Sequence, residues 1–216
     1  MNGEVPAATE PPYCPESFLI FKDLIRIHLT QILKLDSKPP MAAVALLVAV
    51  ACETLSRLLG YAREDEVFAR QLMAHRDVPY PVAQVLFSAL RNGYAHQYRA
   101  NLVDLDGSEI LITLTWKEPG LHLRIVGVEN RDGHLHPVPL NRNQDKRARL
   151  IVDVESLWKD LDALITRVEG RLVEDQALAG NVDANWQARI RKEREKPVGD
   201  AATAWRKWVF SQTWNE

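Results

Sequence analysis

The residues best suited to chemistry lie between Arg91 and Tyr98, in the stretch RNGYAHQY. An arginine beside a titratable imidazole can cleave an RNA phosphodiester without a metal, because RNA carries its own nucleophile, the 2′-hydroxyl group. His96 could move protons as general base or acid, since an unperturbed imidazole has a pKa near ~6.5. Arg91 offers a fixed fork of donors to the charged phosphorane, and Asn92 could orient the phosphate or His96. These residue types therefore predict metal-independent phosphodiester cleavage.

The spacing of this arginine and histidine is not informative by itself, because the chain repeats it elsewhere. One further pair lies close to a run of acidic residues, which predicts a solvated helix face, and the other spans a predicted turn. Neither is followed by an asparagine or a tyrosine at the matching offsets. These two pairs are Arg70 with His75 and Arg131 with His136.

Helical periodicity predicts the elements that position the segment. Apolar residues recur at three- and four-residue steps over residues 16–35, and two prolines then break the pattern. The stretch at 41–59 is apolar nearly all round until Glu53, so we expect it at the centre of a bundle, with a dimer interface as the alternative. Short breaks between successive helices predict an antiparallel bundle. We expect its helices at 16–35, 41–59, 64–75 and 81–101, after a disordered leader at 1–15.

The hydrophobic period changes to two after Asp104. Alternating residues at 110–116 and 121–126 predict a hairpin, with a short edge strand at 134–140 and a further strand at 150–152. Helical spacing returns at 153–173, and the Trp-rich remainder predicts two more helices. We therefore expect a mainly α protein: a helical bundle at 16–103, a β-hairpin or meander insertion at 104–152, a bundle helix at 153–176 and a helical extension at 177–216.

The segment around Arg91 forms one polar arc if it is α-helical. Each residue then turns by about 100°, which places the small Ala95 in the middle of the arc and the core-facing residues of the helix on the other side. A groove beside such a helix would have the small Ala95 side chain as its floor and polar side chains along its walls. The residues of the arc are Arg91, Asn92, His96, Tyr98 and Arg99.

In this context the chain resembles the HEPN superfamily. The motif of that family is an arginine, four to six residues and a histidine on a terminal bundle helix, often with a polar residue directly after the arginine. Arg91, Asn92 and His96 occur here in that order after about 75 residues of expected bundle. With Tyr98, the segment is similar to the Arg-x4-His-x-Tyr form of HEPN toxins that are paired with minimal nucleotidyltransferase antitoxins. The resemblance covers residues 15–101 and extends to the helix at 153–173.

The resemblance implies a metal-independent endoribonuclease that acts as a homodimer and needs no cofactor. Two motif helices, one from each protomer, would line a shared cleft and leave 2′,3′-cyclic phosphate and 5′-hydroxyl RNA ends. It implies a setting in toxin–antitoxin systems or anti-phage defence, with an antitoxin protein as a further partner. The resemblance also implies that Tyr98 is an acceptor for adenylylation. The partner would have to supply that activity, because this chain lacks the Gly-Ser and paired-Asp signature of a nucleotidyltransferase.

Each of these residues also has a purely structural interpretation. His96 could be a partly buried histidine that donates to a carbonyl group, and Tyr98 could serve packing. Arg91 could pair with Glu53, which needs a partner if it is buried. That pair would also tether Arg91, which makes Glu53 a supporting residue of the site.

A second basic stretch lies near the C-terminus, beside Trp186. Its cations could contact RNA phosphates, but Glu193 and Glu195 are interleaved with them, which favours a solvated helix face. The pair His134 and His136 lacks a third ligand at a useful spacing, so we expect no metal. The further candidates for contact with RNA are Arg99, Arg189, Arg191 and Lys192.

Composition sets the limits of these hypotheses. A net charge of −2 excludes a broadly cationic surface, so any RNA site must be a local patch. Two separate cysteines argue against a disulfide framework, and the longest apolar run, about a dozen residues, is too short to span a bilayer. We therefore expect a cytoplasmic protein without a membrane partner.

Three functions remain open. The intact arginine, asparagine and histidine favour a dimeric ribonuclease. The main alternative is a non-catalytic HEPN module that dimerises or binds a nucleic acid or a protein. The third is a plain helical bundle in which the motif is accidental.

Overall fold

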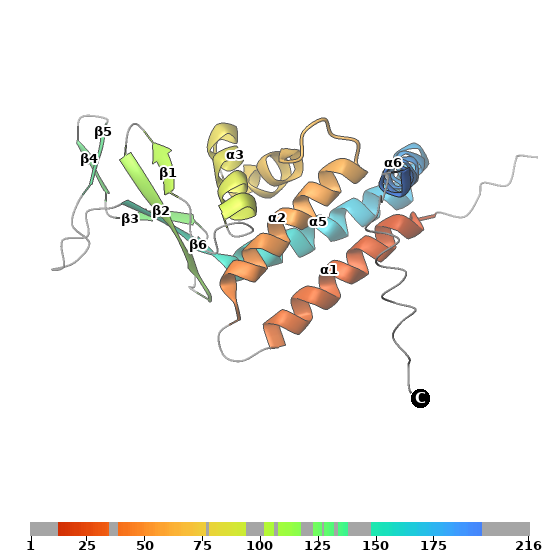
Figure 1. Cartoon of the computed structure of the whole chain (residues 1–216), viewed down its shortest axis with the longest axis horizontal. Helices are drawn as coiled ribbons and strands as arrows, with labels where there is room; N and C mark the ends of the chain where they lie inside the picture. The colour runs from red at the N-terminus through yellow and green to blue at the C-terminus, as the bar shows by residue number, and fades with distance from the viewer. Residues whose placement is uncertain are drawn as a thin grey trace, which may run out of the picture.

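A computed structural model of the chain describes residues 13–34, 39–76, 78–93, 102–105, 108–117, 123–126, 128–131, 134–137 and 148–195. The described part is mainly α, with a sheet at one end of the helices (Figure 1). The α-helices are α1 (Glu16–Lys34), α2 (Met41–Leu58), α3 (Tyr80–Ser88), α5 (Val154–Glu174) and α6 (Gln176–Glu195). Short π and 3-10 segments are η1 (Val67–Leu72), η2 (Ala74–Arg76) and η3 (Ala89–Gly93).

Helix α2 lies at the centre of the bundle, as its apolar surface predicts. It packs against α1, α5 and α6 on different sides, and residues such as Val48 and Leu55 are fully buried. By length and composition alone this helix could cross a membrane, but more than half of it is buried inside the protein. A helix that forms the core of a globular bundle has the same composition.

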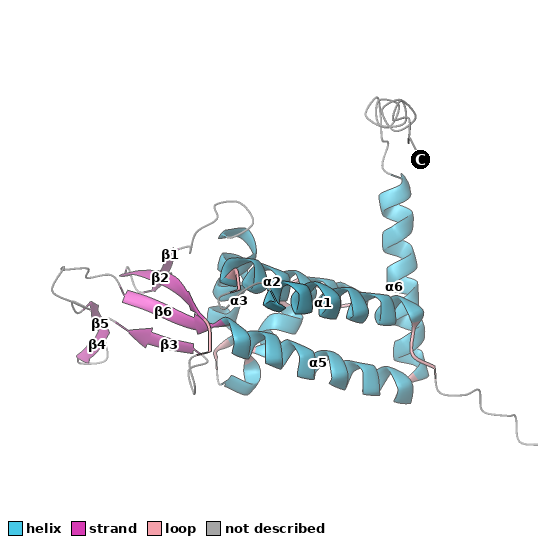
Figure 2. Cartoon of the chain, turned by 90° about the horizontal axis from the view of Figure 1, so that it is seen from below, coloured by secondary structure: helices cyan, strands magenta, loops and turns pink. Residues whose placement is uncertain are grey.

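The long helices α1 and α5 run along one another and bury one face each (Figure 2). Phe18 and Leu29 of α1 are fully buried, while ion pairs join the partly exposed flanks of the two helices. Lys22 Nζ lies 2.6 Å from Glu169 Oε1, and Arg26 Nε lies 2.7 Å from Asp162 Oδ1. The observed bounds of α1, α2 and α5 lie within two residues of those expected from sequence.

The helices expected at 64–75 and 81–101 differ from regular α-helix. The stretch expected as a helix at 64–75 is the π segment η1 followed by the 3-10 turn η2. Helix α3 ends at Ser88 and continues as the π segment η3, so the angular positions calculated for an α-helix do not hold through Ala89–Gly93. The expected continuation from 94 to 101 lies outside the described residues, as does the leader at 1–12.

The expected hairpin between 110–116 and 121–126 is wrong. Strand β2 (Ser108–Thr115) pairs in parallel with β6 (Ala148–Asp153), with Leu114 opposite Val152, and β3 (Leu123–Val126) pairs with the other side of β6. The hydrophobic alternation identified the strands but not their partners. Strand β6 carries the continuous apolar run Leu150-Ile151-Val152, which suits the central position that it occupies.

Three further strands are described. Strand β1 (Leu102–Leu105) pairs antiparallel with β2, which gives the order β1-β2-β6-β3. Strands β4 (Val128–Arg131) and β5 (His134–Pro137) form a separate antiparallel pair, so a short strand is present over 134–137 of the range expected at 134–140. Ile112 of β2 and Val152 of β6 are buried in the same core as the helices, which joins the four-stranded sheet to the bundle.

Candidate functional site

Arg91 lies in η3, directly after α3, and its side chain is 33% exposed. Its Nε donates to Oε2 of Glu53, whose side chain is only 8% exposed. The ion pair expected from the position of Glu53 in an apolar helix is therefore present. It holds the guanidinium of Arg91 at the surface while the carboxylate stays in the core.

The carboxylate of Glu53 is shared with a second arginine. Arg57 Nη2 lies 2.7 Å from Glu53 Oε1, one helical turn further along α2, and also pairs with Glu64. The four side chains thus alternate in charge, from Arg91 through Glu53 and Arg57 to Glu64. The hydrogen bond to Glu53 raises the pKa of Arg91 above its ordinary value and outweighs the opposing effect of burial, so this guanidinium stays charged.

Asn92 holds the same guanidinium from another side. Nη1 of Arg91 donates to Asn92 Oδ1 over 3.0 Å, and Asn92 Nδ2 donates to Ser88 Oγ over 3.2 Å. Arg91 is therefore clamped between a buried carboxylate and an amide that is itself anchored on α3. A side chain held in this way loses little conformational freedom when it binds an anion.

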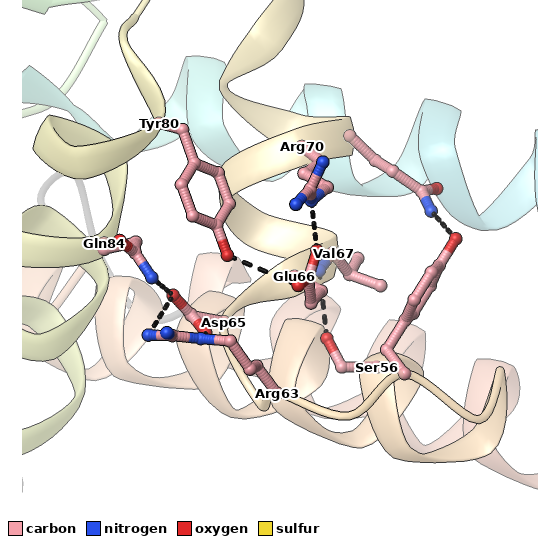
Figure 3. A network of polar contacts seen from close by, with 10 residues as sticks. Ser56, Arg63, Asp65, Glu66, Val67, Arg70, Tyr80 and Gln84 are labelled. Carbon is pink, nitrogen blue, oxygen red and sulfur yellow. Dashed lines mark hydrogen bonds and ion pairs between the residues drawn. The ribbon is translucent and has the colours of Figure 1, made fainter.

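A hollow of about 380 Å³ opens next to this cluster, between the turn before η1 and helix α3. We call it the Asp65 pocket, since Asp65 is its most deeply buried acid, at 7% exposure. Arg63 Nε and Gln84 Nε2 donate to the two oxygens of Asp65 over 3.0 and 2.6 Å (Figure 3). The pocket is lined chiefly by Arg63, Glu64, Asp65, Gln84, Phe87 and Ser88.

The hydrogen bonds determine the protonation of Asp65. Burial alone would raise the pKa of its carboxyl group, but the bonds from Arg63 and Gln84 outweigh burial, and the pKa lies below its ordinary value. The carboxylate is thus ionised at neutral pH and keeps both donors in place. Sequence inspection missed this group, because its members are brought together only by the packing of α3 against the turn before η1.

Comparison of the chain with protein-family models, with curated proteins and with solved structures finds no match. The assignment of function therefore depends on the residues and their geometry. The structure brings together Glu53, Arg91 and Asn92 among the candidates from sequence. The candidates His96, Tyr98 and Arg99 lie outside the described residues.

The basic candidates near the C-terminus lie on α6. Arg189 and Arg191 are exposed there, and the placement of the Lys192 side chain is outside the described part. Helix α6 crosses the other helices at the end of the bundle away from α3, and its last turns project beyond them (Figures 1 and 2). Arg189 and Arg191 thus lie on a different helix from Arg91, within two turns after Asn185, whose Nδ2 donates to Leu58 O at the end of α2.

Other chemistries find little support in the described residues. No group of three or more histidine, cysteine or acidic side chains among them could hold a metal ion. Cys52 is fully buried, and burial raises the pKa of its thiol well above the ordinary value. Burial also raises the pKa of the Cys14 thiol, so neither cysteine is activated as a nucleophile. Arg70, the arginine of another Arg-x4-His pair, is exposed and bonded to Glu66, as expected for a solvated face.

Proposed function

We propose that the chain is a metal-independent endoribonuclease of the HEPN type. The observation that carries the proposal is the clamp on Arg91, in which Glu53 and Asn92 hold a charged, one-third exposed guanidinium directly after a bundle helix. A cation fixed before substrate arrives can stabilise the charge that develops in a transition state without reorganising.

The expected reaction needs only proton transfer and charge stabilisation. The 2′-hydroxyl oxygen of RNA attacks the adjacent phosphorus, and His96 takes the proton from that hydroxyl group. The bond from phosphorus to the 5′-oxygen breaks, and this oxygen takes the proton from the protonated His96 and leaves as a 5′-hydroxyl. Arg91 donates to the phosphorane oxygens throughout, Asn92 and Glu53 position Arg91, and a 2′,3′-cyclic phosphate remains.

We propose further that the active form is a homodimer with RNA as its substrate. Two Arg91 segments would face one another across a shared cleft. By the same resemblance, an antitoxin protein would regulate the enzyme, and Tyr98 would be the residue that it modifies.

Cleavage of single-stranded RNA in EDTA tests the proposal directly. Arg91→Ala should lower the rate by about 10²–10³-fold, as expected for loss of a donor to the transition state. His96→Ala should abolish cleavage. Arg70→Ala is the matched control, because Arg70 is also a carboxylate-bonded arginine but lies apart from the cluster.

The tether is tested separately from the chemistry. Glu53→Gln keeps the shape of the side chain but removes the charge that holds Arg91, and we expect cleavage to fall by about tenfold with the fold retained by circular dichroism. Glu64→Gln, at the far end of the same chain of charges, should change the rate much less. Cleavage that survives His96→Ala would contradict the role assigned to His96, whereas a wild-type protein that binds RNA without cleaving it would favour the non-catalytic binding module.

A further inference from the structure

The Asp65 pocket has the size and the lining of a ligand site. Its volume of about 380 Å³ falls within the range of about 300–1,000 Å³ that is usual for small-molecule sites. Phe87 gives it an apolar floor, 6% exposed and packed against Phe68 with ring centroids 5.6 Å apart. Around that floor stand an arginine, two carboxylates, an amide and a hydroxyl group.

The polar lining is held in a fixed arrangement. Asp65 accepts from Arg63 and Gln84 at once, so one buried carboxylate orients two side chains of the pocket wall (Figure 3). Arg63 donates to Asp65 through Nε and, over 3.4 Å, through Nη2, yet its side chain is 60% exposed. Nη1 and the outer N–H of Nη2 therefore remain as a pair of donors for a ligand. Glu64 stands next to it and is 49% exposed.

The pocket is linked to Arg91 by two polar paths. Ser88 lines the pocket and bonds to Asn92, which bonds to Arg91. Glu64 also lines the pocket and connects to Arg91 through Arg57 and Glu53. Ser88 ends α3 and Arg91 lies three residues later in η3, so the two residues are close along one continuous helical segment. That proximity suits the base and the phosphate of one nucleotide.

We propose that the Asp65 pocket receives a guanine base, that of the nucleotide next to the phosphate held by Arg91. The proposal rests on the ribonuclease function above and deepens it by assigning the base preference. Guanine presents two acceptors, O6 and N7, on one edge, which suit the paired donors of Arg63. Its N1–H and amino group on the other edge suit the carboxylate of Glu64, and its ring lies over Phe87.

Binding of the four nucleoside 3′-monophosphates tests the pocket without requiring catalysis. By titration calorimetry, guanosine 3′-monophosphate should bind at least about tenfold more tightly than the adenosine, cytidine and uridine compounds. Arg63→Ala should remove that preference. Arg63→Lys keeps the charge but loses the fork of donors, so it should retain binding and lose selectivity.

The matched control is Arg70→Ala. Arg70 is 63% exposed and bonded to Glu66, much as Arg63 is bonded to Asp65, but it lies outside the pocket, so guanine preference should be unchanged. Equal binding of all four nucleotides, or guanine preference that survives Arg63→Ala, would overturn the pocket even if RNA is cleaved. Guanine-selective binding that depends on Arg63 in a protein that does not cleave RNA would overturn the ribonuclease and leave the pocket.

Discussion

Carboxylates on this protein hold arginines at its surface. Glu53 fixes Arg91 and Asp65 fixes Arg63, and in both pairs the acid is at most 9% exposed while the arginine is at least 33% exposed. The acid gives up its hydration and is compensated by the guanidinium and further donors. The arginine keeps its outer donors available to a ligand. Both pairs lie at or beside the Asp65 pocket. We therefore assign the RNA phosphate to Arg91 and the neighbouring base to Arg63.

The lowered pKa of Asp65 makes a prediction about acid stability. A carboxyl group with a pKa below its ordinary value of 3.8 stabilises the fold fully above that value, and the stabilisation is lost as pH falls through the lower folded pKa. Asp65→Asn should therefore lower the free energy of unfolding at pH 7 by about 1–3 kcal/mol and by much less at pH 2. Urea titrations at the two pH values measure this.

The control for Asp65 is Asp162→Asn, on the surface pair with Arg26. That carboxylate is 43% exposed, so its removal should cost about 0–1 kcal/mol at pH 7. An Asp65→Asn variant with the same loss of stability at pH 7 and pH 2 would show that ionisation of Asp65 does not stabilise the fold.

At the scale of elements, the sequence predicted what local periodicity determines. Helices α1, α2 and α5 have long apolar stripes, and their bounds followed from them. The π segments η1 and η3 were not predicted, because the wider turn of a π segment leaves no recognisable mark in the hydrophobic pattern. Strands β2 and β3 were found by alternation, whereas β1 and β4 were not expected. The pairing of β2 with β6 depends on residues more than 30 positions apart.

The same limit applies to the candidate site. The pair of Arg91 and Glu53 could be anticipated, because a lone acid in an apolar helix must find a cation when buried. The Asp65 pocket could not, because Gln84 reaches Asp65 only after α3 packs beside η1. A sequence shows which groups need partners, whereas the choice of partner follows from the tertiary fold.

The end of α2 gives a prediction about one element. Gly60 follows this helix with a φ of +76°, and a Cβ there would lie 3.3 Å from Asn185 Nδ2, which donates to Leu58 O. Gly60→Ala should therefore cost about 1–2 kcal/mol. Gly170→Ala, in the last part of α5 with open space around it, should stabilise by about 0.5–1 kcal/mol. Urea midpoints compare the two, and equal shifts of the same sign would contradict this account.

At the scale of the whole molecule, the described fold has two sets of arginines. Arg57, Arg63 and Arg91 lie on α2, after it and on η3, whereas Arg189 and Arg191 lie on α6, whose last turns project beyond the other helices (Figure 2). The chain has a net charge of −2, so its overall charge does not attract RNA. A composite RNA site would therefore need the Arg91 clusters of two chains together.

The surface of α2 suggests how two copies would meet. Val50 is 38% exposed on an otherwise core-forming helix, with Leu46 one turn before it. Residues three and seven positions on share its face, and these are Glu53 and Arg57 of the Arg91 cluster. A second copy that covers Val50 would therefore bring two clusters into one cleft. Helix α1 offers a competing apolar stripe at Ile20, Leu24 and Ile27, each at least 43% exposed, but the described contacts do not connect it to Arg91.

Two matched substitutions, each of which places a charge on one helix, distinguish the α2 face from the α1 face as the dimer interface. If the dimer forms through α2, Val50→Asp should convert it to a monomer in sedimentation experiments and lower RNA cleavage by at least about tenfold, because a carboxylate buried against an apolar partner is strongly unfavourable. Leu24→Asp, at a comparably exposed position, should remain a dimer and keep its rate. Circular dichroism checks that both variants fold. Dissociation by Leu24→Asp instead would place the interface on α1, and a wild-type monomer that cleaves RNA at micromolar concentration would show that one Arg91 cluster suffices.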